Sequence, residues 1–152
     1  MGEHGADAPR TRVGVGVLVV RGDRVLLGRR LGSHGAGSWA PPGGHLEFGE
    51  TAEACARREA AEETGLALGA VREGPYTVDA FPAEGRHYVT LFVVATGTEG
   101  EPRLLEPARC AGWEWHRWDA LPTPLFAPLA SLHARGFVPA GAAADSAEPA
   151  DR

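Results

Sequence analysis

Three glutamates in the middle of the chain have a spacing that could hold a metal ion. Glu59, Glu62 and Glu63 fall at positions i, i+3 and i+4, so their carboxylates share one face if the segment is a helix. Like charges at this spacing repel one another, and a bound cation offsets that repulsion. Oxygen ligands suit Mg²⁺ or Mn²⁺, which share their coordination shells with substrate phosphates. The alternative is a solvated acidic helix face that holds no ion.

A longer segment around these glutamates resembles the signature of the Nudix hydrolases. Gly44 and Glu50 are separated by five residues, and seven more precede the run 58–66 (REAAEETGL). This spacing matches the signature at every fixed position except Ala60, where the family has a bulkier aliphatic residue that contacts no ligand. The resemblance implies hydrolysis of a diphosphate linked to some group X, with Mg²⁺ as the cofactor and Mn²⁺ as a substitute.

Over residues 12–138 the chain resembles the MutT-like nucleotide diphosphatase branch of that family. The resemblance is also carried by LLGRR, GSWAPPGGHLEFGE, HYVTLFV and GWEWHRWDALPTPLF. Members of this branch are associated with (deoxy)nucleoside triphosphates, including 8-oxo-dGTP, and some plant members with dihydroneopterin triphosphate or geranyl diphosphate. The expected reaction converts a (deoxy)nucleoside triphosphate to the monophosphate and pyrophosphate. A pterin or prenyl diphosphate is the alternative substrate, and a nucleotide-binding sensor without turnover is the alternative function.

The resemblance implies a role for each residue near the glutamates. Glu59 and Glu63 would be the main metal ligands, and Glu62 would stand in the same shell. The backbone carbonyl of Gly43 would complete the metal site. Arg58 would orient the carboxylates rather than contact the substrate.

The general base and most substrate contacts lie outside the helix of the signature. The base would be Glu59, Glu63 or an outlying carboxylate, Glu106, for which a surface glutamate is the alternative. Arg30 matches a phosphate-contacting arginine of the family. Single aromatic and histidine side chains are more often structural than functional. With that alternative open, the resemblance implies substrate contacts at Trp39, Gly44, His45, Thr90, Leu125 and Phe126.

The charge balance limits how a phosphate can be held. The chain has 20 acidic and 15 basic residues, a formal charge of −5, and every basic residue is Arg. An acidic chain argues against partners such as nucleic acid or an anionic membrane. The lack of Lys excludes a P-loop and lysine Schiff-base chemistry. A diphosphate or nucleotide is therefore the expected partner, held by arginine, backbone N–H groups or metal.

A series of strands and helices must position these groups. The β-branched stretch 12–20 and the segment 24–30 predict a hairpin, and 31–45 is typical of a loop. The segment 51–64 predicts a helix capped by Thr51 and ended by the following glycine. Further strands are predicted near 68–80, 86–97 and 113–118, and a last helix near 124–135. The order is typical of an α+β fold, and the resemblance implies the Nudix fold, a mixed β-sheet sandwiched between helices (α/β/α).

The 152 residues predict one domain at 11–139, with unstructured tails at 1–10 and 140–152. Two cysteines are too few for a disulfide framework and predict reduced, partly buried thiols. No apolar run is long enough for a membrane span, and the first residues lack the apolar core of a signal peptide. We therefore expect a cytoplasmic protein, and the resemblance adds the expectation of a homodimer.

Overall fold

Strand β1 joins the two halves of a seven-stranded mixed sheet in the computed structural model, which describes residues 10–32 and 34–139. The elements in chain order are β1 (Arg10–Arg21), β2 (Arg24–Arg30), β3 (Trp39–Ala40), β4 (Gly43–His45), α2 (Ala52–Thr64), β5 (Ala70–Phe81), the 3-10 helix η1 (Pro82–Glu84), β6 (Arg86–Thr96), β7 (Cys110–Arg117), the 3-10 helix η2 (Trp118–Ala120) and α3 (Ala127–Ala134).

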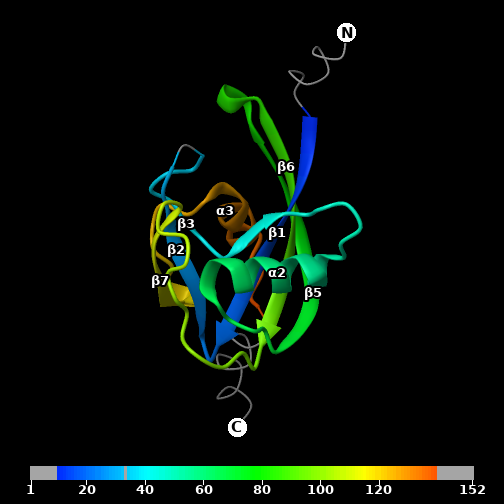
Figure 1. Cartoon of the computed structure of the whole chain (residues 1–152). Coiled ribbons are helices and arrows are strands. Elements are labelled where there is room, and N and C mark those ends of the chain that lie inside the picture. The colour runs from blue at the N-terminus through cyan, green and yellow to red at the C-terminus, as the bar shows by residue number, and fades with distance from the viewer. Residues whose placement is uncertain (1–9, 33, 140–152) are drawn as a thin grey trace.

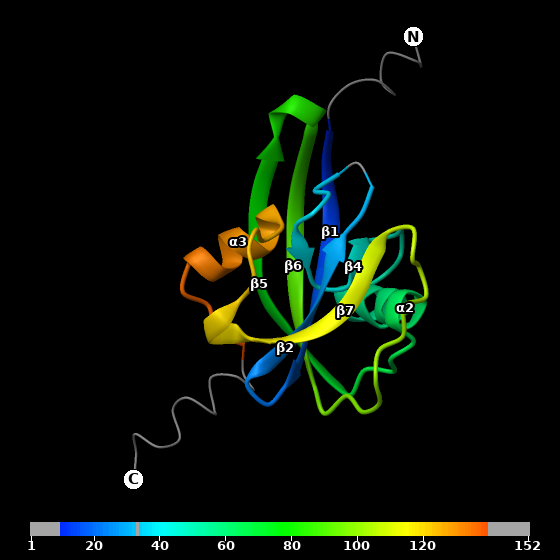
Figure 2. The same cartoon turned by 90° about the vertical axis from the view of Figure 1, so that its left-hand side faces the viewer.

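The strands form the order β3-β2-β1-β6-β5, with β4 paired to β1 and β7 paired to β2. β1 runs parallel to β6, with Val17 opposite Val93, and antiparallel to β4, with Val15 opposite Gly44. The predicted β1–β2 hairpin is confirmed, because Arg21 and Arg24 pair across the Gly22 turn. The β5–β6 hairpin and the first part of β1, which pairs with β6 from Arg10 and Arg86 onward, extend beyond the shorter strands, with η1 at the hairpin tip (Figures 1 and 2).

The two helices lie on opposite sides of the molecule, α2 over one face of the sheet and α3 over the other (Figure 2). A core cluster under α2 includes Val17, Val93 and Ala56. A second cluster, under α3, includes Phe92 and Leu129. This arrangement confirms the predicted α+β sandwich.

Helix α2 is set by local sequence at both ends. The Thr51 hydroxyl accepts a hydrogen bond from the Ala54 N–H at 3.0 Å, which caps the first turn. Gly65 ends the helix in the left-handed region, at φ 78°, and its N–H donates to the Ala61 carbonyl. The predicted cap and stop of this helix are confirmed.

Some element boundaries differ from the sequence prediction. The predicted loop 31–45 contains β3 and β4, and these strands are too short to show an alternating sequence pattern. The last helix begins at Ala127 instead of 124, because the Trp39 N–H donates to the Pro124 carbonyl and holds that segment extended. The strand predicted at 113–118 is β7.

The predicted tails 1–10 and 140–152 lie outside the described residues, except for Arg10, which begins β1. Cys55 and Cys110 are both buried and free, which confirms the thiol prediction. Among the described residues, no helix is long and apolar enough to cross a membrane.

Candidate functional site

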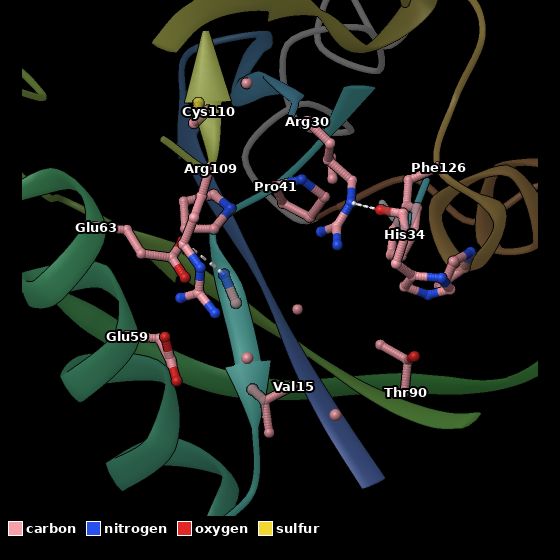
Figure 3. A pocket seen from close by; sticks show the side chains of 18 of the residues that line it. Val15, Arg30, His34, Pro41, Glu59, Glu63, Thr90, Arg109, Cys110 and Phe126 are labelled. Carbon is pink, nitrogen blue, oxygen red and sulfur yellow. Dashed lines mark hydrogen bonds between the residues drawn. The ribbon is translucent and has the colours of Figure 1, made fainter. Parts of the chain in front are cut away.

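A cavity of about 560 Å³ opens between α2, the β1–β6–β4 surface and the segment before α3. Glu59 and Glu63 project toward it from α2 on one side, and Arg30, His34 and Phe126 lie on the other side (Figure 3). Among the sequence-predicted residues, the cavity is lined by Arg30, Gly43, Gly44, His45, Glu59, Glu63, Thr90, Glu106 and Phe126.

The carboxylate wall is built by close contact between α2 and β4. The Gly43 N–H donates to Oε1 of Glu63 at 3.2 Å. A Cβ on Gly44 would lie only 2.2 Å from Oε2 of Glu59, and one on Gly43 would lie 2.2 Å from the Val15 carbonyl oxygen. Glycine at position 44 therefore lets the Glu59 carboxylate reach the β4 backbone, and glycine at position 43 lets β4 lie close against β1.

Arg58 donates hydrogen bonds to several carboxylates, and the orienting role that the resemblance implies for it stays a prediction. Its Nε and Nη2 donate to the two carboxylate oxygens of Glu50, at 2.6 and 3.0 Å. Its Nη1 donates to Oε2 of Glu59 at 2.9 Å, and its Nη2 also donates to the His45 carbonyl oxygen. Charge-assisted, bidentate bonds of this kind are short and directional, so Arg58 links the loop after β4 to the helix.

Glu62 lies apart from the other two glutamates. Its carboxylate is about half exposed, contacts Arg58 Nη1 at 3.4 Å and does not line the cavity. Among the described residues, no group of three or more His, Cys, Asp or Glu side chains is already gathered as a metal cage. The groups that could hold a cation at the cavity are therefore Glu59, Glu63 and the neighbouring Gly43 backbone, and Glu106 also lines the cavity.

The surroundings of the carboxylates disfavour a negative charge on Glu63 and favour one on Glu50. Burial, followed by a hydrogen bond with Glu59 and the charges of Glu59 and Glu106, raises the pKa of Glu63 well above its ordinary value. A cation would remove that penalty. The hydrogen bond from Arg58 lowers the pKa of Glu50 to about 2, so Glu50 stays ionised.

Arg30 faces the carboxylates from the opposite wall, as Figure 3 shows. Its Nε donates to the His34 carbonyl oxygen at 3.0 Å, and its guanidinium lies 4.1 Å from the Phe126 ring centroid. Burial lowers the pKa of Arg30, while the Glu63 charge opposes that shift. The two terminal nitrogens of Arg30 make no hydrogen bond among the described residues, so they are available to an anion.

His45 and Thr90 lie on the floor of the cavity. His45 Nε2 is 3.0 Å from the Tyr88 hydroxyl, and the two rings stack with centroids 5.6 Å apart. Burial lowers the pKa of His45, which favours a neutral imidazole. Thr90 is buried on β6, opposite Gly14 of β1.

Trp39 and Leu125 were expected in the substrate pocket, and the structure does not place them in the lining of this cavity. Both side chains pack against the core cluster under α3, and their backbones form a parallel bridge. The Trp39 ring also lies edge-on to His116, with centroids 5.0 Å apart. Both side chains are partly buried, and they pack against this core instead of lining the cavity.

Several lining residues were not anticipated from sequence: His34, Arg86, Tyr88, Arg109 and Trp113. The His34 ring contacts Phe81 and Phe126 edge-on and stacks on Tyr88, and its Nδ1 bonds to Glu84 at the hairpin tip. These residues come from separate segments with no common spacing. The sequence offered a signal only for Arg86 and Arg109, because a chain without Lys depends on arginine to bind an anion.

Known proteins share both the sequence pattern and the fold. The NUDIX domain family model matches residues 10–138. The chain is 36% identical over 106 residues to an oxidized purine nucleoside triphosphate hydrolase of Danio rerio, covering 70% of this chain and 66% of that protein. It is 36% identical over 135 residues to an RNA pyrophosphohydrolase of Caulobacter vibrioides, covering 76% and 77%.

Among solved structures, the MutT NUDIX hydrolase from Burkholderia pseudomallei is similar, with 36% identity and a TM-score of 0.76. The match covers 82% of this chain and 97% of that structure. The chain spans just under two thirds of the length of the zebrafish relative. From the match over 10–138 and these relatives, the chain belongs to the NUDIX domain family.

Proposed function

We propose that this Nudix hydrolase cleaves (deoxy)nucleoside triphosphates to the nucleoside monophosphate and pyrophosphate in a reaction that requires Mg²⁺. The observation that carries the proposal is the pair Glu59 and Glu63, which faces Arg30 across one cavity. The terminal guanidinium nitrogens of Arg30 make no hydrogen bond within the described residues. A cavity with carboxylates on one wall and arginine on the other suits a metal-bound polyphosphate.

The residues present fit a hard divalent cation. Glu59, Glu63 and the Gly43 carbonyl would hold it, because hard cations prefer oxygen ligands and share their shells with phosphates. Glycine at position 44 leaves room for the Glu59 carboxylate beside the β4 backbone. When bound, Mg²⁺ or Mn²⁺ neutralises charge on the phosphate oxygens and lowers the pKa of a coordinated water. Glu62 does not line the cavity, so we propose that it acts from outside through its contact with Arg58.

The chain's own side chains position the polyphosphate and handle the proton. Arg30 would donate its free terminal N–H groups to phosphate oxygens, and Arg109, which also lines the cavity, would approach from the Glu63 side (Figure 3). The proton of the attacking water would pass to a carboxylate at the same end, with Glu106, Glu59 and Glu63 as the candidates. Glu106 lines the cavity and is about one third exposed, so it can exchange that proton with solvent.

The aromatic end of the cavity supports a planar group X on the substrate. The rings of His34, Tyr88 and Phe126 surround this end, where they could stack on a nucleobase. The zebrafish and mouse relatives are oxidized purine nucleoside triphosphate hydrolases, which supports the same substrate class. The charge of −5 favours a free nucleotide over a polymer. A cytoplasmic location and a homodimer stay predictions.

A substrate panel tests the proposal. The protein would be assayed with Mg²⁺ on dNTPs, 8-oxo-dGTP, dihydroneopterin triphosphate, geranyl diphosphate and a 5′-triphosphate RNA, with pyrophosphate and phosphate release measured separately. We expect pyrophosphate release from a nucleoside triphosphate and its complete loss with EDTA. Turnover of geranyl diphosphate alone would replace the nucleotide assignment. Binding of nucleotides with no turnover of any compound would favour a sensor.

A further inference from the structure

The last turn of α2 contains Glu63, and a helix end of this kind needs outside support. The last four carbonyl groups of an α-helix lack partners within the helix, and helix ends fray unless these groups are satisfied. In α2, the Ala61 carbonyl accepts from Gly65 N–H, and the Thr64 carbonyl accepts from Arg103 N–H. The Glu63 carbonyl needs a donor from elsewhere in the fold.

That donor is the indole of Trp113, whose Nε1 donates to the Glu63 carbonyl oxygen at 3.3 Å. Trp113 belongs to β7, which lies in the other half of the sheet and is 50 residues further along the chain. Its ring lines the cavity and packs against the core cluster under α2. The bond therefore ties the helix end that bears Glu63 to the β2–β7 ladder.

The position of the Trp113 ring is itself fixed by a glycine. Trp113 pairs with Gly28 of β2, and a Cβ on Gly28 would lie 2.8 Å from Cε3 of the indole. The ring thus lies flat against a strand backbone with no side chain in between. A rigidly held donor can hold the helix end in a single position.

We propose that Trp113 is a positioning residue that sets the Glu63 carboxylate for metal binding through its bond to the Glu63 backbone. The proposal rests on the metal site of the proposed function. Outer contacts that orient a metal ligand are typically worth about 10–100-fold in metal affinity. Glu63 makes a second fixed contact, from the Gly43 N–H to its carboxylate, so backbone and side chain are held from two directions.

Trp115 provides a matched control in the same strand. It lies two residues further on, is half-buried against the same core cluster and pairs with Leu26. Its ring contacts the Arg21 guanidinium, 4.3 Å from the ring centroid, and among the described residues its indole makes no hydrogen bond to the end of α2. Trp113→Phe and Trp115→Phe therefore remove similar indoles, and the bond to the helix end is lost in Trp113→Phe.

The experiment measures Mg²⁺ affinity by titration calorimetry and amide hydrogen exchange at the end of α2 in the metal-free protein. For Trp113→Phe we expect about tenfold weaker Mg²⁺ binding and faster exchange of the Gly65 amide. For Trp115→Phe we expect wild-type values of both, with a similar fall in melting temperature. Gly28→Ala is the second variant, used if Trp113→Phe does not fold. Its new Cβ would lie 2.5 Å from Cys110 Sγ and 2.8 Å from Cε3 of Trp113, so the indole must move, and we expect the same loss of Mg²⁺ affinity and the same faster exchange of Gly65.

The outcomes separate this proposal from the one it rests on. Wild-type protein that binds no divalent cation would overturn the metal site, while the exchange measurement would still report on the helix end. Unchanged Gly65 exchange and Mg²⁺ affinity in Trp113→Phe would overturn the positioning role. An equal loss in Trp115→Phe would also overturn it, because the effect would then come from general loss of packing.

Discussion

The two ends of the cavity are built in different ways. The carboxylate end is made by neighbouring segments, β4 and α2, and is held by Arg58, the Thr51 cap and two glycines. The aromatic end gathers His34, Tyr88 and Phe126 from three distant parts of the chain. The first end is a local unit suited to shared chemistry, and the second can vary to select the group X.

The largest expected effect is at the carboxylate end, in Glu63→Gln. The substitution removes the charge of a buried ligand at the proposed metal site, and we expect kcat to fall by roughly 10²–10³-fold. Pyrophosphate release at saturating Mg²⁺ measures it. Glu62→Gln is the control, since Glu62 is exposed and lies outside the cavity. An equal fall in kcat in both variants would show that Glu62 contributes to the reaction as much as Glu63 does.

Gly44→Ala should disrupt the carboxylate end of the cavity by displacing the Glu59 carboxylate. The new Cβ would lie 2.2 Å from Oε2 of Glu59, so that carboxylate must move. We expect Mg²⁺ affinity to fall by about 10–100-fold, with a small change in melting temperature. Calorimetric titration with Mg²⁺ checks the prediction. Wild-type affinity would mean that Glu59 is not held by its contact with β4.

Arg30→Ala tests the wall that faces the carboxylates. Loss of charge-assisted hydrogen bonds to phosphate costs about 1.5–3 kcal/mol, which raises KM by roughly 10–100-fold. Steady-state kinetics on a nucleoside triphosphate measure the change. Arg29→Ala is the matched control, because Arg29 is exposed on the other face of the same strand. If both variants retain the wild-type KM, Arg30 does not bind the substrate phosphate.

His34→Ala should alter selectivity and leave the metal end unchanged. The His34 ring contacts Phe81, Tyr88 and Phe126, and aromatic contacts are worth about 0.5–1.5 kcal/mol each. We expect a change of up to about tenfold in the ratio of kcat/KM between two different nucleotides. The Mg²⁺ concentration for half-maximal rate should not change. A shift in that concentration would show that the two ends are coupled.

The smallest effect concerns the stability of the carboxylate end at low pH. Arg58 lowers the folded-state pKa of Glu50 to about 2, so its stabilising contribution is present above the ordinary value of 4.5 and is lost as the pH falls toward 2. Urea unfolding at pH 6 and pH 3 should show a larger loss of stability for wild type than for Glu50→Gln. Parallel losses would mean that the Glu50–Arg58 bonds do not persist in solution.

Sequence patterns were most informative where the contacts are local. Helix α2, its Thr51 cap and its Gly65 stop follow from residue types within one segment. The shared face of Glu59 and Glu63 follows from helical spacing. Sequence could not separate Glu62 from these two, because the tilt of the helix against β4 decides which carboxylates reach the cavity.

The aromatic end could not be read from the sequence for the same physical reason. His34 lies in a glycine-rich loop, and nothing near it in the chain indicates its contacts with Tyr88 or Phe126. Trp39 and Leu125 have residue types suited to a pocket, yet their side chains pack into the core under α3. Packing between residues that are distant in the sequence decides which aromatic side chains join the core and which line the cavity. Such contacts leave no local sequence pattern.

The sequence by itself determined the family, the helix that bears the carboxylates and the prediction that arginine contacts the anion. The tertiary structure decided which of those groups meet. It placed Arg30 opposite Glu63, set Glu62 outside the cavity and brought the Trp113 indole to the end of α2. Helical periodicity and caps act over a few residues, whereas strand register and packing join residues that are 50 positions apart.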